Sequence, residues 1–250
     1  MQKNNINNLV YGRIPVLEAL RSDIEIEKIF VLFGTHGQNI SEIHKLAKQK
    51  RIKVVQLDRK KFNEVCDIEK SQGVVAVITP IKFREVSDIF KIAEEKKEKN
   101  FILILDEIQD PQNLGALIRT ADCAGVHGII IPKHNAASVT STVIKASAGA
   151  AENFPIAKVG NISQTIEELK QKGIWIVGTD SDADKLYNEI NYDFSVALVI
   201  GSEGKGIRRL VKEKCDFLVK IPLFGRVDSL NASVAAGIVL YEIKNQRMKI

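Results

Sequence analysis

The apolar positions of this chain form short runs that alternate with longer amphipathic stretches. From residue 100 onward the apolar runs are nearly continuous, which is typical of strands buried on both faces of a parallel sheet. The strands predicted there are 101–106, 128–131, 155–159, 174–178, 196–201 and 217–221. The stretches between them have helical spacing and predict helices over 114–124, 140–151, 162–172, 207–214 and 230–246. This alternation predicts one α/β domain over residues 100–250, with helices on both faces of its sheet.

The first 80 residues show the same alternation on a smaller scale. The predicted strands are 28–33, 53–57 and 74–79, and the predicted helices are 14–20, 41–50 and 58–65. Ser41 and Asp58 are the expected N-caps of the last two helices. Residues 81–99 end in a run of mixed charge, AEEKKEKN, which indicates a linker between two domains, an exposed helix end, or both.

Composition and charge narrow the class of protein. The chain has 250 residues and a formal net charge of +5, which is compatible with a polyanionic partner such as RNA. The N-terminus has no secretory pattern and no apolar run is long enough to cross a membrane, so we expect a cytoplasmic protein. The three cysteines are far apart and the four histidines have no ligand spacing, so we expect neither a disulfide framework nor a metal site.

Three polar or glycine-rich segments follow predicted strands, where open parallel sheets bind their ligands. The first reads ILDEIQDPQNLGALIRTADCAGV. Asn113 can cap the helix that follows, and Arg119 lies within that helix on a rather apolar stripe. An arginine in such a place requires a partner or a charged ligand. A structural pair between Arg119 and Asp106 or Asp122 is the alternative to a functional role.

The second segment reads VIGSEGKGIRRL, with Gly201, Gly204 and Gly206 between a strand and a helix. Such a turn allows backbone amides to approach a ligand closely. The spacing differs from the dinucleotide-binding fingerprint, and Glu203 would repel a pyrophosphate. A ligand with positive charge or hydroxyl groups fits better, although a plain turn with a solvated glutamate is also possible.

The third segment reads KIPLFGRVDSLNASVAAGIVLYEI. Ser229 and Asn231 lie at the start of a long helix that is rich in small residues, which permit close approach of a ligand or another helix. A capped helix packed in the core also fits this pattern, but it does not explain the polar pair.

Together these segments resemble the three motifs of the SpoU (TrmH-like) family of RNA ribose methyltransferases, over about residues 100–250. The matching residues are Asn113, Arg119, Gly201, Glu203, Gly204, Ile221, Pro222, Ser229, Leu230, Asn231, Ser233 and Gly237. The opening YGRIPVLEAL also resembles the RlmB-like subgroup of 23S rRNA guanosine-2′-O methyltransferases. Residues 1–80 would then be an RNA-binding domain similar to ribosomal protein L30e, followed by a linker over 81–99.

The resemblance implies a fold, a cofactor and an assembly. The parallel sheet of residues 100–250 would carry a SPOUT-type trefoil knot, and S-adenosylmethionine would bind in that knot. Gly201, Ile221 and Leu230 would contact the cofactor largely through backbone groups. The full cofactor-binding set that we predict is Thr179, Gly201, Gly204, Ile221 and Leu230. Family members are homodimers, so we expect two copies, with the site completed near their interface.

The predicted reaction is transfer of a methyl group from S-adenosylmethionine to a ribose 2′-hydroxyl, with a guanosine of 23S rRNA as the substrate. The arginine matching Arg119 is proposed in the family as a base, but a guanidinium holds its proton with a pKa above about 12. We expect Arg119 to stay charged, to hold the phosphate on the 3′ side and to ease deprotonation of the hydroxyl. Asn113 would orient Arg119 or the ribose, and the rest of the predicted catalytic set, which positions substrate and loops, is Glu203, Ser229 and Asn231.

Phosphates of the RNA are expected to contact basic residues near the site and in the first domain. The candidates are Arg13, Lys82, Lys133, Lys145, Arg208 and Arg226. Three other functions stay open at this point. They are ribose methylation of tRNA, RNA binding without catalysis, and nucleotide-dependent oxidation, which the missing fingerprint disfavours.

Overall fold

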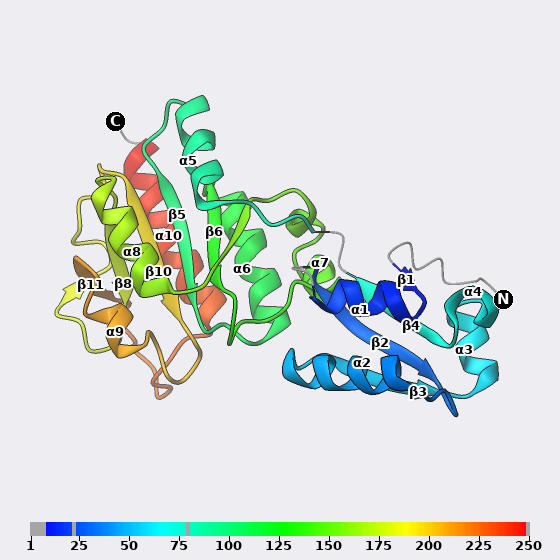
Figure 1. Cartoon of the computed structure of the whole chain (residues 1–250). Coiled ribbons are helices and arrows are strands. Elements are labelled where there is room, and N and C mark those ends of the chain that lie inside the picture. Colours follow the sequence, from blue (N-terminus) through cyan, green and yellow to red (C-terminus); the bar gives the residue numbers. More distant parts are fainter. Residues whose placement is uncertain (1–8, 22–23, 79–80, 249–250) are drawn as a thin grey trace. The chain divides into compact units, whose positions relative to one another are not determined.

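The computed structural model describes residues 9–21, 24–78 and 81–248, which fold into two compact units (Figure 1). The first unit comprises Met1–Ile81 and Ser138–Ser141, and the second comprises Lys82–Ala137 and Thr142–Ile250. Residues 81–99, predicted as a linker, an exposed helix end or both, contain helix α5 (Val86–Glu95), which ends in the charged run and has Ile89 and Ala93 buried. Most of that segment therefore belongs to the second unit.

In the part of the first unit that the structure describes, a four-stranded sheet has helices on both faces. Its strands, in the order β1-β4-β2-β3, are β1 (Leu9–Tyr11), β4 (Val74–Ile78), β2 (Ile26–Leu32) and β3 (Lys53–Leu57). β2 and β3 run parallel, whereas β4 runs antiparallel to β1 and β2. Its helices are α1 (Arg13–Arg21), α2 (Gln38–Gln49), α3 (Arg59–Val65) and α4 (Ile68–Ser71).

The alternation of side chains along β2 divides the apolar residues of this unit into two layers. Ile29 and Val31 face a cluster with α1 and α2, and Phe30 and Leu32 face the smaller cluster around Phe62 of α3. The predicted cap of α3 is confirmed, because the Asp58 side chain accepts a hydrogen bond from the Lys61 amide at 2.9 Å. The predicted start of α2 at Ser41 is wrong, since the helix begins at Gln38 after Gly37.

The second unit contains, among the described residues, a seven-stranded parallel sheet. Its strands, in spatial order, are β7 (Ile156–Val159), β6 (Gly128–Pro132), β5 (Phe101–Asp106), β10 (Val196–Gly201), β8 (Trp175–Thr179), β11 (Phe217–Lys220) and β9 (Lys185–Leu186). Every residue of the central strands β5 and β10 is buried, as their continuous apolar runs predict. The predicted α/β architecture with a parallel sheet is therefore confirmed.

Helices cover both faces of this sheet. They are α5, α6 (Pro111–Cys123), α8 (Ile162–Gln171), α9 (Arg209–Lys212) and α10 (Ala232–Met248). α7 (Ser141–Ala146) and a 3₁₀ turn at Ala150–Glu152 lie against α6. α5, α8 and α9 share one buried cluster with alternate residues of the strands. On the other side α6 and α10 pack against each other, and α10 also packs against β10. Thr120 of α6 would lie 3.5 Å from a Cβ on Gly237, so this small residue of α10 accommodates a neighbouring helix.

The strand order brings the three polar segments to one edge of the sheet. β10 lies between β5 and β8, and β11 pairs with the other side of β8. Gly201 is in register with Asp106, and Val219 with Thr179. Because all these strands are parallel, the residues that follow them emerge at the same carboxyl edge, where ligands bind in open α/β sheets.

Candidate active site

Asn113 joins the three segments through hydrogen bonds of its side-chain amide. Its Nδ2 donates to Oε2 of Glu203 at 3.3 Å, and its Oδ1 accepts from Nδ2 of Asn231 at 2.8 Å. The prediction that Asn113 caps its helix is wrong. Asp110 caps α6 by accepting from the Gln112 amide at 3.0 Å, and this leaves the Asn113 side chain available for the two other segments.

Ser233 fixes which way the Asn231 amide points. The backbone amide and Oγ of Ser233 both donate to Oδ1 of Asn231, at 2.9 and 2.6 Å. The Asn231 nitrogen is therefore turned toward Asn113, and the Asn113 nitrogen toward Glu203. The sequence marks Ser233 only as a motif residue with a small side chain, although an asparagine two residues before it, at a helix start, is a known capping pattern.

The segment after β10 folds back on itself as a tight loop. Ser202 and Gly206 exchange two backbone hydrogen bonds of 3.1 and 2.9 Å, with the exposed Glu203 and Gly204 between them. A Cβ on Gly201 would lie 2.0 Å from the carbonyl carbon of Gly206. Gly204 has a φ of +80°, in the left-handed region that favours glycine. These glycines therefore allow the loop to close on the end of β10 and hold Glu203 near Asn113.

A buried carboxylate fastens this loop to the neighbouring strand. Asp106 is fully buried and accepts from the Arg208 backbone amide at 2.9 Å and from Nε and Nη2 of Arg208 at 2.8 and 2.6 Å. The hydrogen bond to Asp106 raises the pKa of Arg208, and the charges of Asp106 and Glu107 act in the same direction. Arg208 is therefore engaged within the protein, which replaces the phosphate contact predicted for it, and Asp106 is not a partner of Arg119.

Replacing Arg208 with alanine should lower the free energy of unfolding by about 2 kcal/mol, because it leaves a buried charge without its partner. The loss should be smaller than for a fully buried pair, since 45% of the Arg208 side chain is exposed. Urea denaturation measures it, with Arg209→Ala as the control. Arg209 pairs with Glu213 on the surface, so its removal should cost less than about 1 kcal/mol. Equal losses for the two variants would contradict the role of Arg208.

Arg119 lies on the exposed side of α6. Six residues of helix separate it from Asn113, which places the two side chains about 120° apart around the helix axis. Within the described part of the chain its guanidinium makes no hydrogen bond or ion pair. The structure therefore does not bring Arg119 to Asn113. Ser229 is also exposed, and its Oγ donates to Asp228 at 3.4 Å instead of joining the amide network.

Three of the predicted cofactor-binding residues, Thr179, Gly201 and Ile221, lie at the carboxyl ends of β8, β10 and β11. In the described chain, the backbone groups of Ile221–Leu230 form no hydrogen bonds with other backbone groups. Ile221, Pro222 and Leu230 are half-buried along this segment. Apolar side chains beside unpaired backbone donors and acceptors can hold a flat heterocycle and its ribose. These residues therefore fit a nucleoside-type cofactor.

One charged pair borders this edge. Lys212 of α9 forms an ion pair with Asp180, the residue after Thr179. The hydrogen bond to Asp180 raises the pKa of Lys212, and the charges of Asp180 and Asp182 act in the same direction. Lys212 therefore stays protonated at neutral pH and keeps the end of β8 tied to α9.

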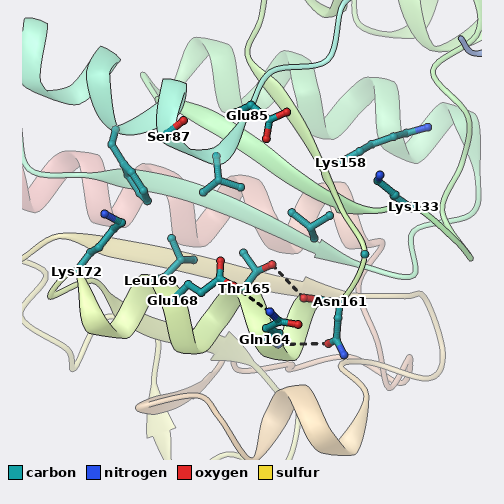
Figure 2. Close-up of a pocket in the computed structure, with 14 residues that line it drawn as sticks. Glu85, Ser87, Lys133, Lys158, Asn161, Gln164, Thr165, Glu168, Leu169 and Lys172 are labelled. Carbon is teal, nitrogen blue, oxygen red and sulfur yellow. Dashed lines mark hydrogen bonds between the residues drawn. The ribbon is translucent and has the colours of Figure 1, made fainter. Parts of the chain in front are cut away.

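A separate pocket of about 650 Å³ lies between α5 and α8, near the end of β7. Figure 2 shows its polar side chains, which include Lys133, Lys158, Asn161 and Glu168. Much of its polar lining is bonded internally: Asn161 caps α8, and Gln164 Nε2 donates to Glu168 at 3.2 Å. Of the predicted site and phosphate-binding residues, only Lys133 lines this pocket, so we assign no cofactor to it.

The described cysteines and histidines form neither a reactive thiolate site nor a metal site. Burial raises the pKa of the Cys66 thiol, and it raises that of Cys215 to about 12, so both stay protonated at neutral pH. Among the described residues no three His, Cys, Asp or Glu side chains are grouped closely enough to bind a metal ion. No helix in that part of the chain is long and apolar enough to span a bilayer.

Comparison with known families matches both units of the chain. Residues 100–241, more than half of the sequence, match the SpoU rRNA methylase family. Residues 9–84 match the substrate-binding domain of RNA 2′-O ribose methyltransferases. The SpoU rRNA methylase match covers the three segments at the sheet edge. The substrate-binding match covers the unit at the N-terminal end of the chain.

Individual proteins resemble the chain over nearly its whole length. YacO of Bacillus subtilis (strain 168), a protein named for the TrmH family of tRNA/rRNA methyltransferases, is 47% identical over 96% of both chains. The crystal structure of an rRNA methyltransferase from Sinorhizobium meliloti is 26% identical, with a TM-score of 0.60 over 95% of this chain and 86% of that one. The SpoU methyltransferase AviRb of Streptomyces viridochromogenes, solved with AdoMet, has the same fold, with 24% identity and a TM-score of 0.61 over 97% and 91% of the chains.

Proposed function

Because the chain belongs to the SpoU rRNA methylase family, we propose that it transfers the methyl group of S-adenosylmethionine to a ribose 2′-hydroxyl of RNA. The observation that carries this proposal is the network in which Asn113 joins Glu203 to Asn231, because it unites the three motif segments at one sheet edge. We propose a guanosine of 23S rRNA as the substrate. Ribose methylation of tRNA is the second candidate, since the relatives are named for both kinds of RNA.

The cofactor would lie against the ends of β8, β10 and β11. Thr179, Gly201, Gly204, Ile221 and Leu230 would hold it, with the unpaired backbone of Ile221–Leu230 facing its polar groups. When bound, S-adenosylmethionine supplies a methyl group activated by a sulfonium. AviRb, which shares this fold, was solved with that cofactor, and this supports the assignment.

Arg119 would act on the substrate as a permanent cation. Its guanidinium is exposed and makes no ion pair with any described residue, so it is available for a phosphate. Holding the phosphate on the 3′ side would place positive charge near the 2′-oxygen and favour its deprotonation. The bidentate geometry of the guanidinium would also fix the ribose in line with the methyl group.

A second copy of the chain would complete the site. Val234 and Tyr241 are 50% and 52% exposed on α10, the helix that packs beside α6. We propose that these apolar side chains are covered in a homodimer, which would place the exposed Arg119 close to the interface. Sedimentation of the purified protein would test this, and a monomer at micromolar concentration would contradict it.

The amide network would position Glu203 and the third segment for the substrate. Asn113→Asp keeps the shape of the side chain and can still accept from Asn231, but it turns the contact with Glu203 into a repulsion between carboxylates. We expect at least a tenfold fall in methyl transfer with an unchanged affinity for S-adenosylmethionine. Glu203→Gln should partly restore the double variant, because the repulsion is removed. Failure of that rescue would contradict the proposed contact.

Transfer of a tritiated methyl group to purified rRNA and tRNA tests the proposed function. We expect label in rRNA, recovered as 2′-O-methylguanosine after digestion to nucleosides. Label only in tRNA would favour the second candidate, and label on a base would contradict ribose methylation. Calorimetric titration with S-adenosylmethionine and with NADH separates this function from a nucleotide-dependent oxidation.

A further inference from the structure

The first unit carries an aromatic side chain that its own fold leaves uncovered. Phe33 follows β2 directly and is 75% exposed, although a phenyl ring at such a position gains nothing from water. We propose that Phe33 stacks on an unpaired base of single-stranded RNA, while the basic residues beside it hold the phosphates of that strand. This inference rests on the proposed function, since it names the residues with which the first unit would bind the RNA substrate.

The residues around Phe33 come from four segments at one edge of the sheet. We define the Phe33 edge as Gly12–Arg13, Phe33–Gly37, Asp58–Lys61 and Gln72–Gly73. Sheet hydrogen bonds bring them together: the Phe33 amide donates to Leu57 at 2.8 Å, the Leu32 amide to Gly73 at 2.9 Å, and the Gly12 amide to Val74 at 3.0 Å.

The loop that carries Phe33 is held in place on several sides. Arg13 donates from Nε to the Gln72 carbonyl at 3.3 Å and from Nη1 to the His36 carbonyl at 3.4 Å. The Thr35 amide closes a turn onto Leu32 at 3.0 Å. A Cβ on Gly73 would lie 2.7 Å from Oγ1 of Thr35, which shows how tightly the loop lies against this glycine. The ring is therefore offered from a fixed loop, which lowers the entropy lost when a base binds.

Basic residues follow β3, the strand whose end accepts the Phe33 amide. Arg59, Lys60 and Lys61 are exposed in the first turn of α3, directly after the strand end that accepts the Phe33 amide. The carboxylate next to them, Asp58, is engaged in the cap of α3 and lies 3.8 Å from Nζ of Lys61. An aromatic platform beside basic residues is the combination that binds single-stranded nucleic acid, since every base has a face that can stack and every nucleotide carries a phosphate.

The opposite edge of the same sheet provides an internal comparison. Lys48 near the end of α2 and Lys53 at the start of β3 are also exposed there, so positive charge alone does not distinguish the two edges. The exposed phenyl ring of Phe33 is what distinguishes the Phe33 edge from the opposite edge. Stacking accounts for the preference for an unpaired strand, because the bases of a duplex are already stacked on each other.

Fluorescence titration of the full-length protein with labelled oligoribonucleotides tests the proposal. The probes are an eight-nucleotide adenosine oligomer and a 16-base-pair RNA duplex. Phe33→Ala should weaken binding of the single strand about 5- to 150-fold, and Phe33→Leu should do the same, whereas Phe33→Trp should bind as well as the wild type. The added tryptophan emission should be quenched by the single strand. Binding of the duplex should not change in any of these variants.

Charge is tested with two matched triple variants. Replacing Arg59, Lys60 and Lys61 with glutamine should lower the salt dependence of single-strand binding by about two ions, at roughly 0.7 per contact. The same change at Lys48 and Lys53 of the opposite edge, together with Lys45, an exposed residue of α2, should alter affinity less than about twofold. Equal losses in the two triples, or an unchanged affinity in Phe33→Ala, would overturn the proposal.

Failure of this inference can be told apart from failure of the proposed function. Phe33 lies in the first unit, so its variants should bind S-adenosylmethionine as the wild type does. If Phe33→Ala left oligonucleotide binding unchanged while the wild type methylated RNA, the stacking site would be wrong and the function would stand. If the protein bound no S-adenosylmethionine but lost RNA affinity in Phe33→Ala, the stacking site would stand and the proposed function would be wrong.

Discussion

Replacing Arg119 with alanine should lower single-turnover methyl transfer at least about 100-fold, the range seen when a fixed group that stabilises developing charge is removed. The folded protein should not need this side chain, because it is exposed and makes no ion pair with any described residue. The melting temperature and the affinity for S-adenosylmethionine should therefore stay unchanged. Arg119→Lys keeps the charge but loses the bidentate fork, so we expect at least about a tenfold fall, or 1.4 kcal/mol.

The matched control for this experiment is Arg209→Ala. Arg209 is another exposed arginine of the same unit; it belongs to the second segment, but it pairs with Glu213 and takes no part in the hydrogen bonds of Asn113, Glu203 and Asn231. It should transfer methyl groups at the wild-type rate. A near-normal single-turnover rate in Arg119→Lys, or equal losses in the Arg119 and Arg209 alanine variants, would refute the role given to Arg119.

Gly201→Ala should produce the largest combined loss of stability and cofactor affinity. The added Cβ would lie 2.0, 2.2 and 2.3 Å from backbone atoms of Gly206 and Ile207, and backbone cannot rotate away as a side chain can. The loop would have to open, at a cost of about 1–3 kcal/mol or more for an overpacked site. Opening would also displace Glu203 and weaken binding of S-adenosylmethionine at least about tenfold. Urea denaturation and calorimetric titration measure the two effects.

Gly160→Ala is the control for Gly201→Ala, because a Cβ there meets nothing within 4 Å and its backbone lies outside the left-handed region. It should be neutral in both measurements. If Gly201→Ala behaved like Gly160→Ala, the closed loop on the end of β10 would not be the arrangement that the protein uses.

Buried strands were the part of the fold that local sequence predicts best. β5 and β10 match their predicted ranges residue for residue, because each is a nearly continuous apolar run of strand length with polar residues on both sides. α5 has helical spacing, with five apolar residues among its ten, but the charged run that follows it indicates a linker as well as a helix end. Burial of Ile89 and Ala93 assigns the helix to the second unit. β1 and β9, with three and two residues, are too short to leave a periodic signal.

At the site, residue types could be predicted but pairings could not. The resemblance pointed to Asn113, Glu203 and Asn231, and the structure joins them across 90 and 118 residues of sequence. The pairing of Arg208 with Asp106 spans 102 residues, so no local pattern distinguishes Arg208 from an arginine that contacts a phosphate. The trefoil knot and the similarity to L30e stay predictions, because the path of a chain through its own loops leaves no local pattern.

We propose that this sheet edge readies a ribose 2′-oxygen of RNA for methylation, with Arg119 as the essential cation. Mapping 2′-O-methyl groups in total RNA from cells with the protein, cells without it and cells carrying Arg119→Ala tests both parts of this proposal. We expect a 2′-O-methylguanosine of 23S rRNA to vanish without the protein and to stay absent with Arg119→Ala. An identical map of rRNA and tRNA in all three would contradict the account.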